Sequence, residues 1–192
     1  MLTISKTPKG KALAMIEYTS IANGITALDI VTKTAEVDIL SAQAICPGKY
    51  MILFSGSLGA VRASLDGLGR VPNQIDQFLL GRPHPDVFAA LNAKVSLEGK
   101  TALGLIETHS GAASLKAADT AAKTSWITLA EIRISQGMCG KSTVMFTGDL
   151  AAVAAALETA KKEAAGNGQL LDTALIPNPD AKMIAALNMS SH

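Results

Sequence analysis

Apolar and polar positions along this chain form a pattern that occurs twice. Each half opens with a short apolar run, at residues 12–17 and 102–107, whose length is typical of a buried strand. A serine after each run marks the N-cap of a predicted helix. We expect the first of these helices to end near Thr34 and the second near Thr124.

The rest of each half continues the same series of elements. Two strands joined by a glycine-containing turn predict a hairpin, and an amphipathic helix, a fourth strand and a short terminal helix follow it. The strands expected after the first helix span residues 37–40, 50–54 and 75–81 in the first half and 127–134, 143–146 and 170–176 in the second. Each half therefore reads β-α-β-β-α-β-α, and the predicted fold class is α/β, an α+β sandwich.

Individual residues repeat at a nearly constant offset. ALAMIE at 12–17 returns as ALGLIE at 102–107, 90 positions later, and Gly48-Lys49 returns as Gly140-Lys141, 92 positions later. An offset that drifts so little indicates a tandem duplication with small changes in loop length, whereas a solenoid needs shorter and more numerous units. We place the first domain at residues 1–98 and the second at 99–192, with residues 92–101 as the linker.

Composition and charge narrow the classes of function. Apolar residues make up 48% of the chain and charged residues 17%, so disorder is not expected, and the low charge points to an oligomer. The net charge is +1 with few aromatic residues, which argues against a nucleic-acid partner. We also expect no signal peptide, no membrane span and no membrane partner, hence a cytoplasmic location.

Enzymatic chemistry finds little support. Residues 140–142 resemble the end of a phosphate-binding loop, but Ser135 stands where that motif requires a glycine, and a strand is predicted to follow. The three histidines share no metal-ligand spacing. Glu17 and Glu107 match between the copies, but no partner base is visible for either carboxylate. We therefore expect that the chain is not an enzyme.

The two cysteines are the remaining chemical candidates. Cys46 lies in the predicted hairpin turn of the first copy and Cys139 in that of the second, and glycine- or proline-containing turns are places where a thiol is accessible. In a reducing cytosol both are expected to be free thiols. One thiol cannot hold a metal cluster, whereas one thiol per subunit around a symmetry axis forms a ring. Two incidental small residues are the alternative.

Several dispersed motifs together resemble the bacterial microcompartment (BMC) shell-protein family. They are the apolar run at 12–17, Ala-Leu-Asp at 27–29 with Lys33, and Arg82-Pro83-His84. The second copy departs from the last motif, where it reads Pro-Asn-Pro at 177–179. Both copies begin with the same strand and helix, so the chain resembles the non-permuted tandem type. The resemblance implies a homotrimer that mimics a hexamer and tiles with other shell proteins into the shell of a microcompartment.

The resemblance also implies which residues carry function. The hairpin turns would line a central pore, with pore-loop residues Ile45, Cys46, Pro47, Gly48, Lys49, Met138, Cys139, Gly140 and Lys141. Cys46 from three subunits would bind a 4Fe-4S cluster for electron transfer, as implicated for a member of the family, with an encapsulated redox enzyme as a further partner. Cys139 has no counterpart in that member, and three roles stay open for it: a second ligand, a resolving thiol or a small pore residue. Contacts at the shell edge would come from Lys33, Lys123 and Arg82.

Other readings stay open at this point. The pore would either hold the cluster or conduct small molecules. Outside a shell, the chain would be a cysteine-dependent redox protein or a ligand-sensing α/β protein, using Cys46 or Cys139.

Overall fold

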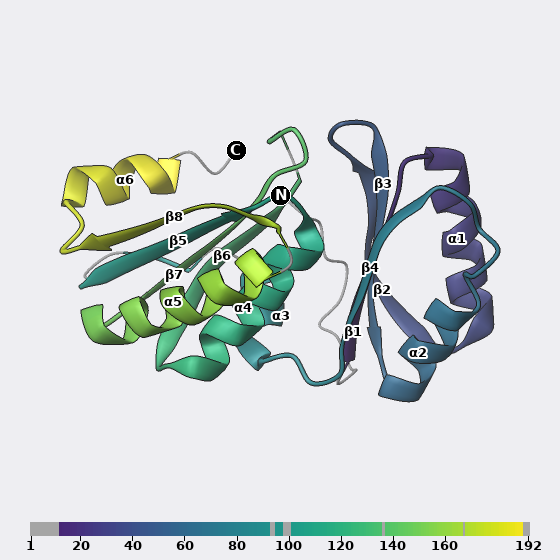
Figure 1. The fold of residues 1–192 in the computed structure, drawn as a ribbon, viewed down its shortest axis with the longest axis horizontal. Helices are drawn as coiled ribbons and strands as arrows, with labels where there is room; N and C mark the ends of the chain where they lie inside the picture. The colour runs from purple at the N-terminus through teal and green to yellow at the C-terminus, as the bar shows by residue number, and fades with distance from the viewer. Residues whose placement is uncertain (1–11, 93–94, 98–100, 136, 167, 190–192) are drawn as a thin grey trace. The chain divides into compact units, whose positions relative to one another are not determined.

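The computed structural model describes residues 12–92, 95–97, 101–135, 137–166 and 168–189 of the 192 residues. The predicted linker at 92–101 lies partly outside these residues. The chain forms two compact units, one ending at Pro83 and the other beginning at His84. Each unit is a four-stranded antiparallel sheet with helices packed on it (Figure 1).

The first unit contains six of the elements. Its sheet has the order β2-β3-β1-β4, so the first strand is central and pairs with both β3 and β4. The elements are β1 (Ala12–Tyr18), α1 (Ile21–Thr34), β2 (Val37–Ile45), β3 (Lys49–Gly56), α2 (Leu58–Asp66) and β4 (Gln74–Leu80).

Alternation along β1 decides which side chains form the core of the first unit. Ala14, Ile16 and Tyr18 point to the face that α1 and α2 cover, where they pack with Phe54 of β3. Leu13, Met15 and Glu17 point to the opposite face and are also buried. A strand that is buried on both faces reads as a continuous apolar run, which is why the sequence identified it.

The second unit repeats this arrangement in the order β6-β7-β5-β8. Helices α4 and α5 cover one face of its sheet, and α6 contributes Ile184 to an apolar cluster with Leu103 and Met145 on the other. The elements are α3 (Pro85–Asn92), β5 (Ala102–Thr108), α4 (Gly111–Thr124), β6 (Ile127–Ile134), β7 (Ser142–Gly148), α5 (Leu150–Gly166), β8 (Leu170–Pro177) and α6 (Ala181–Met189).

The predicted order of elements is confirmed in both copies. The Oγ atom of Ser20 accepts a hydrogen bond from the Asn23 N–H at 3.3 Å, and that of Ser110 accepts one from the Ala113 N–H at 3.2 Å. Each serine therefore caps a helix that ends at the predicted threonine. Among the described residues, no helix is long and apolar enough to cross a membrane.

Strand β2 is longer than the sequence predicts, reaching Ile45 rather than Leu40. A bulge between Ile39 and Ser41 changes the alternation of its side chains, and a matching bulge lies between Leu129 and Glu131 of β6. After its bulge β6 continues with Ile132 and Ile134, whereas β2 continues with the small or polar residues 41–44, which explains why only β2 was predicted too short.

Helix α3 belongs to the second compact unit, although the sequence repeat places it at the end of the first copy. It packs on β6 and α4 and buries Val87 and Leu91. The boundary between the compact units thus lies before α3. The domain limits 1–98 and 99–192, which follow the sequence repeat, stay a prediction.

Candidate functional site

The β2–β3 turn that contains Cys46 is a short connection. The last paired residues of the hairpin are Ile45 and Lys49, so only Cys46, Pro47 and Gly48 form the turn. Gly48 has a φ of +80°, which glycine adopts without strain, and the peptide bond between Cys46 and Pro47 is cis. The thiol of Cys46 is free and the residue is half-buried. The turn therefore presents one half-buried thiol per chain.

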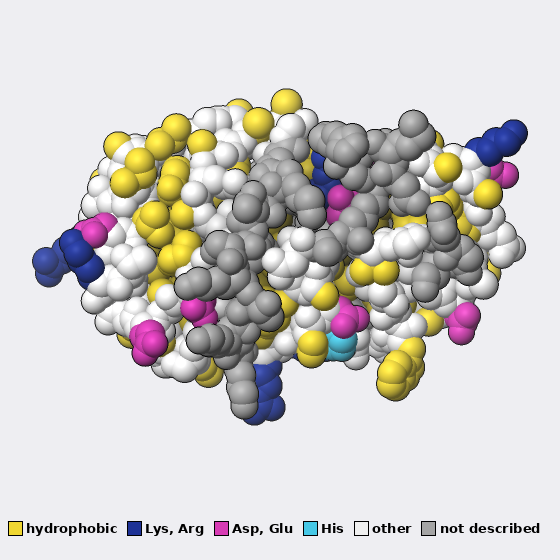
Figure 2. Space-filling model, turned by 180° about the vertical axis from the view of Figure 1, so that it is seen from behind, with side chains coloured by type: hydrophobic (Ala, Val, Ile, Leu, Met, Phe, Trp, Pro, Cys, Tyr) yellow, Lys and Arg dark blue, Asp and Glu magenta, His cyan; other side chains and the backbone are white. Residues whose placement is uncertain are grey.

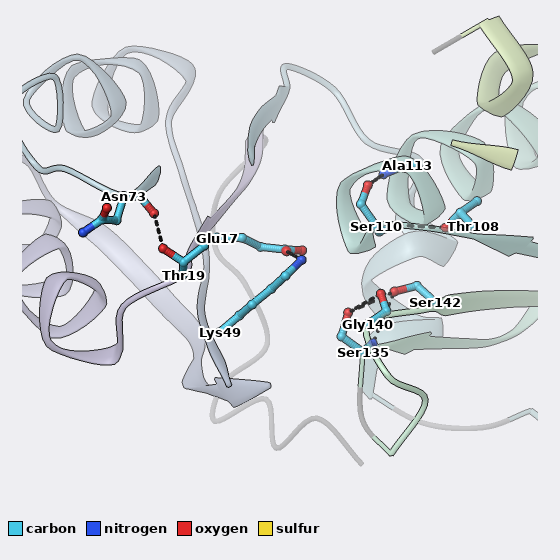
Figure 3. Close-up of polar contacts among 10 residues, drawn as sticks. All are labelled: Glu17, Thr19, Lys49, Asn73, Thr108, Ser110, Ala113, Ser135, Gly140 and Ser142. Carbon is cyan, nitrogen blue, oxygen red and sulfur yellow. Dashed lines mark hydrogen bonds and ion pairs between the residues drawn. The ribbon is translucent and has the colours of Figure 1, made fainter. Parts of the chain in front are cut away.

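The β6–β7 turn is longer, and Ser135 closes it at its base. The Ser135 N–H donates to the carbonyl of Lys141 at 3.1 Å, and the Ser135 hydroxyl donates to the carbonyl of Gly140 at 3.1 Å (Figure 3). Above this closure, the Lys141 N–H donates to the Met138 carbonyl at 3.0 Å. Cys139 is exposed and has a φ of +50°, an uncommon value for a non-glycine residue. The second thiol is thus more accessible than the first.

A lysine of each turn pairs with a glutamate of the central strand. Lys49 Nζ lies 3.2 Å from Glu17 Oε2, where the side chains are 24% and 1% exposed (Figure 3). Lys141 Nζ lies 3.9 Å from Glu107 Oε2, where they are 54% and 33% exposed. These pairs supply the basic partners that the sequence did not reveal, because the lysine lies far along the chain. The positive charge of Lys49 is therefore largely offset, whereas that of Lys141 faces solvent.

Glu17 has a further feature that matters for the turn. Its Oε1 atom is buried and accepts no hydrogen bond within the described part of the chain. Asp76 of β4 lies directly opposite in the ladder, so Lys49 is the cation that offsets the negative charge at this end of the sheet. The pair fixes Lys49, the residue that follows the Cys46 turn.

The surroundings of the two turns differ in chemistry. In the first copy, a methyl group on Gly24 of α1 would overlap the ring of Tyr50, so the ring packs directly on the helix backbone. At the matching level of the second copy, the hydroxyls of Thr108 and Ser114 lie 2.8 Å apart. The neighbouring Tyr18 is fully buried, and burial raises the pKa of its phenol above the ordinary value. The strand residues next to the β2–β3 turn are therefore aromatic, whereas those at the matching level of the second copy carry hydroxyl groups.

Each of the two hairpin turns contains one of the predicted cysteine ligands. Among the described residues, no group of three His, Cys, Asp or Glu side chains is arranged to hold a metal ion. Thiolates are the ligands that iron–sulfur clusters use, so the donor type fits. The donor number fits only when several chains contribute a cysteine to one centre.

The predicted edge lysines each pair with an aspartate one helical turn earlier. Lys33 Nζ lies 2.7 Å from Asp29 Oδ2, an exposed pair, and Lys123 Nζ lies 2.6 Å from Asp119 Oδ2. Asp119 is buried, and its Oδ1 also accepts the backbone N–H of His84 at 2.7 Å. The i,i+4 spacing of acid and lysine is a sequence signal that could have predicted both pairs, but neither was predicted from it. Arg82 is exposed and lies in the first unit.

Comparison with known proteins gives one consistent result. The model of the BMC domain matches residues 12–79 and again residues 102–179. The bacterial microcompartment shell protein PduT of Citrobacter freundii is 34% identical over 90% of this chain and 95% of its own. The carboxysome assembly protein CcmO of a Synechocystis strain is 26% identical over 88% of this chain and 62% of its own length.

Solved structures show the same fold. A microcompartments protein from Desulfitobacterium hafniense superposes with a TM-score of 0.83 at 41% identity, covering 90% of this chain and 97% of its own. A fused permuted hexameric shell protein of the RMM microcompartment superposes with a TM-score of 0.60 at 21% identity, covering 85% and 86%, which supports the fold alone.

Proposed function

The chain belongs to the BMC-domain family as a structural shell protein of bacterial microcompartments, and from that premise we propose that it forms a homotrimer whose six domains mimic a hexamer and tile into the shell. The duplication supports this stoichiometry. Two similar domains per chain need three chains to supply the six positions of a hexameric tile, and closed rotational symmetry is the usual form of a homo-oligomer.

In this trimer the β2–β3 and β6–β7 turns line the central axis. Symmetry would then bring three copies of Cys46 around one point, each on a three-residue turn. We propose that these three thiolates hold a 4Fe-4S cluster, which when bound would supply one-electron transfer across the shell. The single observation that carries this proposal is the free, half-buried thiol of Cys46 in the short β2–β3 turn, one per chain.

The residues around the thiol support the same assignment. Lys49 follows the turn, and Glu17 binds its Nζ atom, so the charge near the thiolates is kept close to neutral. The N–H groups of a tight turn are natural donors to cluster sulfurs. Cys139, on a separate turn, is a secondary ligand or resolving thiol in this proposal. Other shell proteins and an encapsulated redox enzyme are the proposed partners.

A second function is conduction of small molecules through the same axis. Lys141 favours it, because 54% of its side chain is exposed and its glutamate is 3.9 Å away. Three such lysines around an axis would attract anions.

The experiment is anaerobic purification followed by iron and sulfide analysis, an absorption spectrum and light scattering for the mass. Trimers with one cluster each, lost in Cys46→Ser but retained in Cys139→Ser, are expected. Colourless trimers after reconstitution, identical to Cys46→Ser, would rule out the cluster and leave conduction. Turnover of a substrate with rapid alkylation of one cysteine would instead favour the cysteine-dependent redox class.

A further inference from the structure

The chain's only tryptophan is fully on the surface. Trp126, between α4 and β6, is 98% exposed. Tryptophan carries the largest apolar side chain and is enriched in protein interfaces. An indole left this exposed by the described residues therefore suggests a binding partner. It lies beside a hollow of about 610 Å³, whose other lining residues are His84, Asp86, Ala122, Lys123, Thr124, Ser125 and Ile127. We refer to Trp126 and this hollow as the Trp126 surface.

The fold does not require an aromatic residue at this position. Val37 and Ile127 occupy the same register, opposite Gly56 and Gly148, so Glu36 is the counterpart of Trp126 in the first copy. The same turn therefore forms with a charged residue. The Ile127 N–H donates to the Ser125 carbonyl at 2.9 Å, which fixes the backbone independently of the indole.

The charges of the Trp126 surface select the kind of group that it can receive. Asp119 lies 2.6 Å from Lys123 Nζ and offsets that charge. Asp86 is 40% exposed, and its Oδ1 lies 3.8 Å from His84 Nδ1, beyond hydrogen-bond distance. An aromatic face beside an accessible carboxylate is a site for a lysine or arginine side chain, through a cation–π contact and an ion pair. Figure 2 shows, on this unit, a histidine next to an acidic side chain, with a hydrophobic side chain protruding nearby.

The first unit of the same chain carries suitable cations. Lys33 is 74% exposed, and its pair with Asp29 is exposed at both ends, so it can be exchanged at little cost. Arg82 is also exposed. We infer that the Trp126 surface of one copy receives Lys33 or Arg82 of a second copy. This inference rests on the proposed tiling. The inference adds that the second unit of one copy contacts the first unit of another, because the second unit supplies the aromatic receptor and the first unit supplies the cation.

The lone tryptophan makes a direct test possible. Fluorescence of the unmodified chain is followed from isolated trimers to assembled sheets, with acrylamide as the quencher. We expect Trp126 to be fully quenchable in the trimer and to show blue-shifted, protected emission in the sheet. Protection already present in isolated trimers would overturn the inference, because the indole would then lie between subunits of one tile.

Variants test the chemistry of the contact. Trp126→Ala should weaken sheet assembly roughly two- to thirtyfold per contact, the range of a single cation–π pair. Lys33→Ala or Arg82→Ala should reproduce that loss, and Ile75→Ala, which removes another exposed apolar side chain, should not. Unchanged unfolding transitions show that each variant folds.

The outcomes separate this inference from the proposed function. If sheets form but Trp126 stays fully quenchable in them, only this inference is overturned. The same holds if neither Lys33→Ala nor Arg82→Ala weakens sheet assembly. A chain that forms no sheets under any condition overturns both.

Discussion

Lys49 Nζ lies 3.2 Å from Oε2 of Glu17, so the residue that follows the Cys46 turn is tied to a buried carboxylate of the central strand. The matching pair of the second copy is longer and more exposed. Duplication has thus kept the pair while changing its surroundings, so the pair of one copy is a control for the pair of the other.

Glu17→Gln should destabilise the chain by about 1–3 kcal/mol, because it leaves the Lys49 ammonium without its partner in a largely buried place. Glu107→Gln should change stability by less than about 0.5 kcal/mol, because exposed pairs contribute little. Urea unfolding of both variants measures the difference. Equal effects would show that the burial of Glu17 is not what gives its pair strength.

Asp119→Ala should cost about 1–3 kcal/mol, because it removes the acceptor of the His84 N–H and the partner of Lys123 together. Asp29→Ala breaks only an exposed pair and should stay within about 0.5 kcal/mol. Hydrogen exchange should show faster exchange in α3 for the first variant alone. Unaltered exchange in α3 would mean that Asp119 does not hold this helix.

Gly24→Ala should destabilise the first unit by roughly 1–3 kcal/mol, since the added methyl would overlap the ring of Tyr50. Gly59→Ala is the control within the same unit. No atom lies within 4 Å of its added methyl, and it should stabilise α2 by about 0.5–1 kcal/mol. Thermal unfolding measures both. Two changes of the same sign would contradict the packing of Tyr50 on α1.

Stability should fall as the pH rises above about 10, the region where an unfolded tyrosine ionises. Burial raises the pKa of Tyr18 in the folded chain. In this pH range the unfolded state therefore loses a proton that the folded state keeps, which favours unfolding. Tyr18→Phe should remove this contribution, which is at most about 1.4 kcal/mol per pH unit. Urea midpoints measured from pH 7 to pH 11 test it.

The same variant gives a second result at pH 7. The Tyr18 hydroxyl accepts and donates no hydrogen bond within the described residues, so Tyr18→Phe should leave stability unchanged or raise it by about 1 kcal/mol. A clear loss at pH 7 would show that the hydroxyl has a partner.

The sequence was sufficient for most of the fold, for identifiable physical reasons. The apolar run of β1 and the N-cap serines Ser20 and Ser110 can be read from the local sequence. Because the chain is duplicated, each kind of signal occurs twice. The end of β2 was missed because residues 41–44, beyond the bulge, are small or polar and show no apolar alternation. The packing of α3 on β6 and α4 was not predicted, because docking between distant elements leaves no periodic trace.

The candidate site was predictable only as far as its residue types. Both cysteines lie in turns as expected, but their unequal exposure depends on the length of each turn and on the closure by Ser135. Glu17 and Lys49 could be seen as matched residues, and their contact required the strand register. The exposure of Trp126 left no signal beyond its being the only tryptophan.

The closure of the β6–β7 turn by Ser135 makes its tip a natural place to graft new sequence. The backbone bond to Lys141 and the hydroxyl bond to Gly140 complete the hairpin below Met138 and Cys139. Residues added between these two would therefore disturb the turn bond from Lys141 to Met138 but leave the strand pairing intact. The entropy of closing a loop grows only slowly with its length, by about 0.6 kcal/mol for each doubling. In the proposed trimer, a peptide tag or metal-binding segment inserted there would be displayed in three copies at the central axis.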